Sequence, residues 1–170
     1  MQPRAKLFGF NSFDDGSQTK RAILDTNVMY PALHNPAGVC GRIVLLGTGP
    51  LAELYSIDLA REELRINLER KKLGFVQDDA KFIISGLPIR WMPKEVYSRD
   101  LTRAMKSVKI PQDAAFLAAS LATGIAMVTG DSHLQTEKAR RLINIYKPRD
   151  FLELLAPGHR RPQSRCSHED

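Results

Sequence analysis

Cysteine is scarce in this sequence, and its scarcity excludes two ways of stabilising a fold. The 170 residues include only two cysteines, Cys40 and Cys166, which lie far apart. Two distant cysteines provide neither a disulfide framework nor the close ligand spacing of a zinc site. The sequence therefore predicts a fold without structural disulfides or structural zinc.

Long apolar runs are also missing. No stretch approaches the roughly 20 residues that a helix needs to span a bilayer, and the apolar run at 7–10 is too short for the core of a signal peptide. The composition, with 43% hydrophobic and 26% charged residues, is ordinary for a soluble globular protein. We therefore expect a cytoplasmic protein without a membrane segment.

Length and charge bound the organisation of the chain. A length of 170 residues suits one domain with a substantial core, since chains near 150 residues bury roughly 70% of their extended surface. We expect this domain at 21–156, between a flexible leader at 1–20 and a flexible basic tail at 157–170. The net charge of +6 favours a polyanionic partner, because Lys and Arg release counterions from a phosphate backbone.

Short apolar strands alternate with helices along the chain. The predicted strands lie at 22–24, 54–57, 89–92, 125–128 and 143–146, and the predicted helices at 38–46, 59–72, 77–85, 94–105, 111–122, 137–142 and 151–155. The segment 28–36 is expected to be irregular because Pro31 and Pro36 interrupt it. The alternation predicts a three-layer α/β/α fold with a central parallel sheet of four to five strands.

An acid follows directly on the first predicted strand. Residues 22–24 are apolar without alternation, as in a strand buried on both faces, and Asp25, Thr26 and Asn27 come next. Ligands of parallel α/β sheets bind at the carboxyl ends of strands, so Asp25 is well placed for chemistry. The alternative is that Asp-Thr-Asn is ordinary turn and cap material.

The fourth predicted strand ends in the same way. After 125–128 the chain continues through Thr129 to Asp131, which is a second candidate at the carboxyl edge of the sheet. The alternative is that Ser132 and Gln135 form a capping box, with Asp131 merely part of the polar approach to a helix.

A third acid, Asp113, lies in the first turn of the helix that begins at Pro111. An acid in this position also complements the helix dipole, so a purely local role is the alternative. Whether Asp113 approaches the same edge of the sheet depends on how its helix packs.

The fourth acid, Glu63, stands out on the helical wheel of 59–72. The apolar residues cover one broad side of this helix, and Glu63 and Asn67 fall within that side, whereas Glu62 falls on the charged side. We therefore expect Glu63 to face the body of the protein, where a carboxylate must be protonated, paired with a cationic side chain or bound to a metal. A buried ion pair and a metal site remain equal alternatives.

Convergence of these acids would require cations between them. Carboxylates that meet in one pocket repel one another, and oxygen ligands without Cys or His select hard ions such as Mg²⁺ or Mn²⁺. Such ions activate water for attack on a phosphodiester. The candidates for holding a phosphate backbone are the cations of two helices: Arg61, Arg65, Arg70, Lys71 and Lys72, then Lys138, Arg140 and Arg141. The alternative for each is a solvated helix face.

The order and spacing of these motifs resemble a PIN domain of the VapC toxin type. The matching segments are Ile23-Leu24-Asp25-Thr26-Asn27, Glu63-Leu64, the helix start at 113–119 and Val128-Thr129-Gly130-Asp131, followed by Pro148-Arg149-Asp150-Phe151-Leu152. The resemblance covers residues 21–155 and includes neither the leader nor the basic tail.

The resemblance implies a Mg²⁺- or Mn²⁺-dependent endoribonuclease, the toxin of a toxin–antitoxin pair, that acts on RNA, is inhibited by a small antitoxin protein and forms a homodimer. It implies an acidic quartet of catalytic metal ligands: Asp25, Glu63, Asp113 and Asp131. It also implies that Asn27 and Thr129 support the site near the metal.

The sequence departs from the family pattern at two positions. Ile57 stands where family members frequently have Ser, and His133 stands where they often have an acid. The alternative function is a PIN-fold module that binds RNA or a protein partner without cutting. A phosphotransfer receiver domain is disfavoured, because Asp25 lacks the neighbouring acid that such domains carry.

Overall fold

The computed structural model describes residues 19–70, 77–108 and 110–157. The predicted leader at 1–20 and tail at 157–170 therefore lie almost wholly outside the described residues. Lys71 and Lys72, two of the candidate RNA-binding cations, lie outside them as well.

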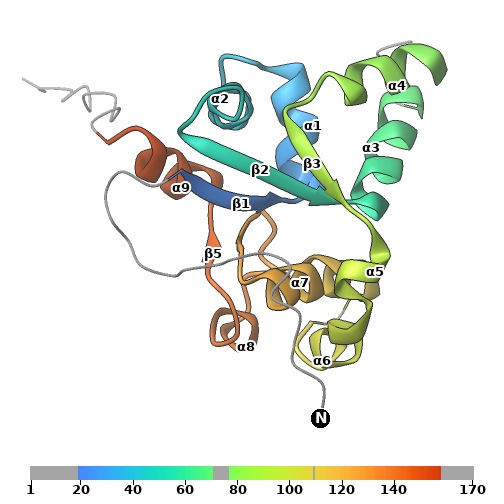
Figure 1. The fold of residues 1–170 in the computed structure, drawn as a ribbon, viewed down its shortest axis with the longest axis vertical. Coiled ribbons are helices and arrows are strands. Elements are labelled where there is room, and N and C mark those ends of the chain that lie inside the picture. The colour runs from blue at the N-terminus through green and yellow to red at the C-terminus, as the bar shows by residue number, and fades with distance from the viewer. Residues whose placement is uncertain (1–18, 71–76, 109, 158–170) are drawn as a thin grey trace, which may run out of the picture.

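The centre of the molecule is a parallel sheet of five strands in the order β3-β2-β1-β4-β5 (Figure 1). The strands are β1 (Lys20–Leu24), β2 (Ala52–Ile57), β3 (Ile89–Met92), β4 (Ala126–Val128) and β5 (Ile145–Tyr146). The predicted α/β fold with a parallel sheet is confirmed, and each strand overlaps the segment predicted for it.

The apolar run of β1 occupies the middle of this sheet. Ala22, Ile23 and Leu24 are completely buried, because β2 and β4 flank the strand and helices cover both of its faces. Leu24 pairs with Val128 of β4, and the N–H of Asp25 donates to the carbonyl of Val128 at 3.1 Å. The register therefore brings the carboxyl ends of β1 and β4 together.

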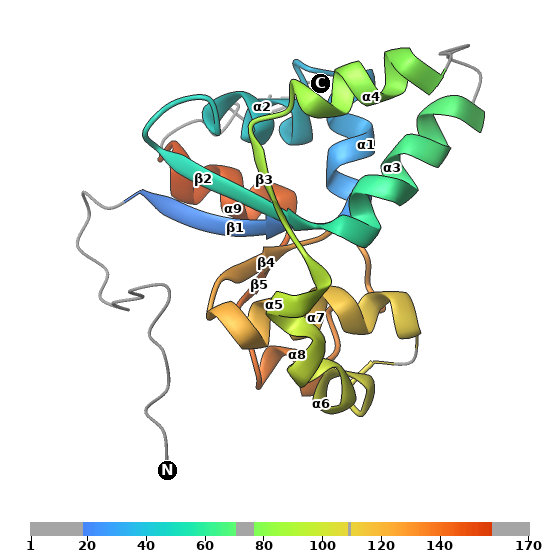
Figure 2. The ribbon, with the colours of Figure 1, turned by 45° about the vertical axis from the view of Figure 1, so that its right-hand side comes forward.

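Helices form a layer on each side of the sheet (Figures 1 and 2). One layer contains α1 (Thr26–His34), α2 (Val39–Leu46), α3 (Asp58–Arg70), α4 (Gln77–Ser85) and α9 (Pro148–Leu155). The other contains α5 (Lys94–Tyr97), the 3₁₀ turn η1 (Ser98–Asp100), α6 (Leu101–Met105), α7 (Pro111–Thr123) and α8 (Glu137–Arg140). Within the described residues, no helix combines the length and the apolar character that crossing a bilayer requires.

The helix α7 delivers Asp113 to the sheet and leads the chain into β4. Pro111 occupies its first turn, where a missing N–H costs nothing, and its Ala-rich body is buried. It ends at Gly124, whose φ of 72° is left-handed and whose N–H donates to the carbonyl of Ser120. This turn lets β4 begin two residues later.

The expectation of an irregular segment at 28–36 is wrong. Residues Thr26–His34 form α1, with Pro31 inside the helix. Val28, Met29 and Ala32 are buried against the core, and the free energy of this packing outweighs the one helical hydrogen bond that proline lacks. The ring of Pro31 lies on the exposed side of the helix.

Two further local predictions differ from the structure. The predicted helix 94–105 is divided into α5, η1 and α6. Ser and Asp, which favour helix ends over helix interiors, occupy the 3₁₀ turn. The capping box at Ser132 and Gln135 does not form, because Thr136 caps α8 instead, its hydroxyl accepting from the N–H of Ala139 at 3.2 Å.

Candidate active site

Asp25 is a buried carboxylate at the carboxyl end of β1. Its exposed fraction is 7%, and its Oδ2 accepts a hydrogen bond from the hydroxyl of Thr129 at 2.7 Å. Burial raises the pKa of Asp25 to about 6, with a smaller contribution from the negative charge of Glu63, while the Thr129 hydroxyl and the first N–H groups of α1 oppose the rise. Asp25 is thus a strongly desolvated acid with one firm hydrogen-bond partner.

Thr129 and Asn27 connect the ends of β1 and β4. The fully buried Thr129 hydroxyl donates to Asp25 and accepts from the N–H of Asp131 at 2.9 Å and from the side-chain amide of Asn27 at 3.3 Å. The side-chain oxygen of Asn27 in turn accepts from the N–H of Gly130 at 3.1 Å. This network holds the loop that carries Asp131 against the loop that carries Asp25.

Asp113 and Asp131 face this network from α7 and from the loop after β4. Oδ1 of Asp131 accepts the backbone N–H of His133 at 2.8 Å. Asp113 is half-buried, and its Oδ2 is buried without a hydrogen-bond partner in the part of the chain that the structure describes. Burial raises the pKa of Asp113, as do the charges of Asp131 and Glu63, whereas His133 lowers it.

Glu63 reaches the same region from α3. Its Oε2 accepts a hydrogen bond from the hydroxyl of Thr26, the first residue of α1, at 2.8 Å. The expectation that Glu63 is buried is wrong, because the residue is exposed. The helical wheel placed Glu63 on the correct side of α3, but at this position that side packs against α1 and leaves the Glu63 side chain exposed.

The four acids form one electrostatic neighbourhood. The charge of Glu63 raises the pKa of both Asp25 and Asp113, and the charge of Asp131 raises the pKa of Asp113. They do not form a compact ligand set: across residues 19–70, 77–108 and 110–157, no group of three or more His, Cys, Asp or Glu side chains is placed to hold a metal ion.

The residues nevertheless fit a hard divalent cation. All four side chains offer oxygen donors, and Asp113 has a buried carboxylate oxygen that no described residue hydrogen-bonds. The raised pKa values of Asp25 and Asp113 reflect desolvation and mutual repulsion, which a cation would relieve. Mg²⁺ commonly keeps several waters and binds through one or two carboxylates, so a preformed three-residue cage is not required.

Thr26 is a residue of this site that the sequence analysis did not single out. It is 5% exposed, and its hydroxyl donates to the Glu63 carboxylate in a contact between residues 37 positions apart. Its place in the Asp25-Thr26-Asn27 segment was the available signal, but turn propensity explained it equally well. The two departures from the family pattern differ in their surroundings: Ile57 is completely buried, and His133 is exposed.

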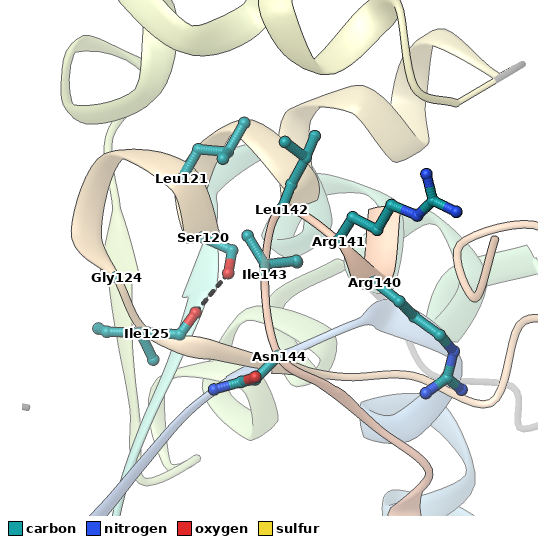
Figure 3. Close-up of a pocket in the computed structure, with 9 residues that line it drawn as sticks. All are labelled: Ser120, Leu121, Gly124, Ile125, Arg140, Arg141, Leu142, Ile143 and Asn144. Carbon is teal, nitrogen blue, oxygen red and sulfur yellow. Dashed lines mark hydrogen bonds between the residues drawn. The ribbon is translucent and has the colours of Figure 1, made fainter. Parts of the chain in front are cut away.

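A cavity of about 270 Å³ lies elsewhere, near the amino ends of β4 and β5 (Figure 3). Its lining includes Ser120, whose hydroxyl donates to the carbonyl of Ile125, and Arg140 and Arg141, whose guanidinium groups extend away from Ser120. None of the four acids lines this cavity. The candidate site is therefore the acidic edge and not this cavity.

Proteins of known structure share this architecture. A chain of the VapBC2 complex from Rickettsia felis, bound to a DNA fragment from their promoter, matches 75% of this chain and 98% of its own length with 13% identity and a TM-score of 0.54. A chain of DNA-bound VapBC from Salmonella typhimurium matches 76% of this chain and 99% of its own length, with 14% identity and a TM-score of 0.53. PAE2754 from Pyrobaculum aerophilum matches 86% of this chain and 96% of its own length, with 18% identity and a TM-score of 0.53.

The chain has a VapC-like PIN-domain fold. The PIN-like fold predicted from the sequence motifs is thus confirmed. No protein-family model and no curated protein matches the sequence, so the likeness rests on the fold. In this PIN fold the acids lie where β1 and β4 end, together with the first turn of α7 and the second turn of α3.

Proposed function

We propose that the chain is a Mg²⁺- or Mn²⁺-dependent endoribonuclease that hydrolyses RNA phosphodiester bonds at the acidic edge of its PIN fold. The observation that carries the proposal links four carboxylates from separate segments. The charge of Glu63 raises the pKa of Asp25 and of Asp113, and the charge of Asp131 raises the pKa of Asp113. An edge of this kind repels RNA unless it also holds cations.

In this proposal each residue has a distinct role. Asp25, Asp113 and Asp131 hold the ion, and Glu63, oriented by the Thr26 hydroxyl, completes the acidic set. Thr129 fixes the orientation of Asp25, and Asn27 fixes the loop that carries Asp131. The bound ion would supply an activated water and neutralise charge on the scissile phosphate.

The structural neighbours support a wider biological role. Three of them are described as VapBC or FitAB assemblies with DNA. We propose that this chain is likewise the toxin of a toxin–antitoxin pair, with a small antitoxin protein as its partner and a homodimer as its assembled form.

The test is RNA cleavage by the purified chain with Mg²⁺, with Mn²⁺ or with EDTA. We expect cleavage with either metal, none with EDTA, and a loss of at least about a hundredfold in Asp25→Asn, because a neutral amide is a poor ligand for a hard cation. Glu63→Gln and Glu62→Gln form a matched pair on α3, since Glu62 is exposed and bonded to Arg65. Of this pair, Glu63→Gln should lose activity and Glu62→Gln should keep it.

The absence of a compact ligand set among the described residues favours a second candidate, a PIN-fold module that binds RNA or protein without cutting. That candidate predicts RNA binding without metal-dependent cleavage. Cleavage that persists unchanged in folded Asp25→Asn would count against the nuclease assignment and would indicate a contaminating enzyme.

A further inference from the structure

Several of the cations that the sequence suggested for RNA binding are engaged within the protein. Arg65 bonds to Glu62 and Glu69 on α3. Arg61 lies over the ring of Trp91 at 5.8 Å from its centroid. These side chains would have to leave existing partners in order to bind a phosphate.

The same holds on α8. Arg141 pairs with Glu137, and Arg140 donates to the side-chain oxygen of Gln135 at 3.0 Å. Lys138 is the exposed exception on this helix, with no hydrogen bond or ion pair to the described part of the chain.

A different row of cations is available on η1 and α6. Arg99, Arg103 and Lys106 are all exposed, and none of their side chains forms a hydrogen bond or ion pair with the residues that the structure describes. Arg99 lies in η1, Arg103 lies in α6, and Lys106 is the residue directly after α6. Arg103 and Lys106 are three residues apart and are therefore neighbours on the helix surface. We call these three residues the α6 cationic row. Neither of the nearby acids, Glu95 and Asp100, forms an ion pair with a residue of this row.

The α6 cationic row adjoins the candidate active site. Helix α6 packs against α7, whose first turn carries Asp113 (Figure 2). The carbonyl of Ser107, next to Lys106, accepts from the hydroxyl of Thr136 at 3.4 Å. Thr136 ends the loop that carries Asp131 and begins α8, where Lys138 lies. The row therefore flanks the acidic edge on the side of α7.

We propose that the α6 cationic row binds the phosphate backbone of a single RNA strand and guides it to the acidic edge, a proposal that rests on the proposed nuclease function. From Arg99 through η1 and α6 to Lys106 the chain advances by at most about 12 Å, at about 1.5 Å per α-helical residue and about 2 Å per 3₁₀ residue. Phosphates along one stacked strand advance by about 3.4 Å each, so the row matches about three of them. Because these cations are unpaired, no existing ion pair has to break before they bind a phosphate.

The test measures binding separately from cleavage. A short fluorescein-labelled single-stranded RNA is titrated with the full chain in EDTA, by fluorescence anisotropy, over a series of KCl concentrations. We expect Arg99→Gln/Arg103→Gln/Lys106→Gln to bind about tenfold or more weakly at moderate salt and to reduce the slope of log K against log salt by about 2. The matched control removes three charges elsewhere: Arg42→Gln/Lys147→Gln/Arg149→Gln.

The outcomes distinguish this proposal from the proposed function. Equal loss of affinity in both triple variants, or no loss in the row variant, overturns the guiding role of α6 even if the wild-type chain cleaves RNA. A selective loss in the row variant supports it even if no metal-dependent cleavage is found, in which case the nuclease proposal alone fails. Circular dichroism of each variant establishes that it is folded.

Discussion

At the scale of single residues, Asp25 is held in a state that opposes folding. Its carboxylate is buried beside the Thr129 hydroxyl, and its pKa is raised from 3.8 to about 6. One pKa unit corresponds to about 1.36 kcal/mol, so ionised Asp25 destabilises the fold by about 3 kcal/mol at neutral pH. An acid kept at such a cost is characteristic of functional sites.

Asp25→Asn should therefore be more stable than the wild-type chain at pH 7, in the absence of divalent ions. The folded state prefers protonated Asp25, so the contribution of Asp25 to stability is fully present below about pH 3.8 and is lost as the pH rises through about 6. The stability gap between the two proteins should open over that range. Thermal unfolding with EDTA at several pH values measures it, and a gap independent of pH would contradict the assignment.

Thr26 offers a second test at this scale. Thr26→Val removes the hydroxyl that donates to Glu63 and keeps the shape of the side chain. We expect a loss of about tenfold in kcat for RNA cleavage, with a change in unfolding free energy of about 1 kcal/mol, the net contribution of one hydrogen bond. Thr26→Ser should restore most of the activity. Equal activity of all three proteins would show that Glu63 needs no positioning by Thr26.

At the scale of elements, α1 shows packing overriding a local sequence signal. Pro31 lacks the N–H that would donate to the carbonyl of Asn27, but the helix persists because its inner side is buried. Pro31→Ala should raise the unfolding free energy by about 1 kcal/mol, since the regained hydrogen bond exceeds the lost restriction of the unfolded chain. Urea unfolding measures the change, and a destabilised variant would mean that the ring itself packs productively.

The same contrast explains which elements could be predicted. The bounds of α4 and β3 agree exactly with the prediction, because Gly86 ends the helix and Pro88 and Pro93 flank the strand. Helix α1 was missed because its proline is a strong local signal, whereas the burial of Val28 and Met29 depends on contacts with distant segments. Local rules identify ends of elements but not the packing that compensates for an unfavourable residue.

Local rules also identified the part of the candidate site that lies at strand ends, but not the part that depends on packing. Asp25 and Asp131 were found because each follows an apolar strand, and parallel strands share one carboxyl edge. The exposure of Glu63 and its bond to Thr26 could not be predicted, since both depend on how α3 packs against α1. The proposed metal-binding roles of the four acids remain predictions.

At the scale of the whole molecule, the last helix packs against two elements that are far apart in the sequence. Helix α9 packs against α2 and against β5, and Phe151 lies with its ring centroid 6.2 Å from that of Tyr146. Phe151 is 2% exposed, whereas Leu154 on the same helix is 44% exposed. Helix α9 therefore links the sheet edge at β5 to α2, which lies about 100 residues earlier in the chain.

This arrangement predicts that α9 stabilises the entire domain and not only its own surroundings. Phe151→Ala should lower the unfolding free energy by about 3 to 5 kcal/mol, the cost of a cavity in a packed core, while Leu154→Ala should change it by less than about 1 kcal/mol. Urea unfolding followed by tryptophan fluorescence at Trp91 and by circular dichroism should show one coincident transition in each variant. Trp91 lies on β3, at the opposite edge of the sheet from β5. Separate transitions in Phe151→Ala would mean that the β5 edge unfolds alone and that the sheet does not couple its two edges.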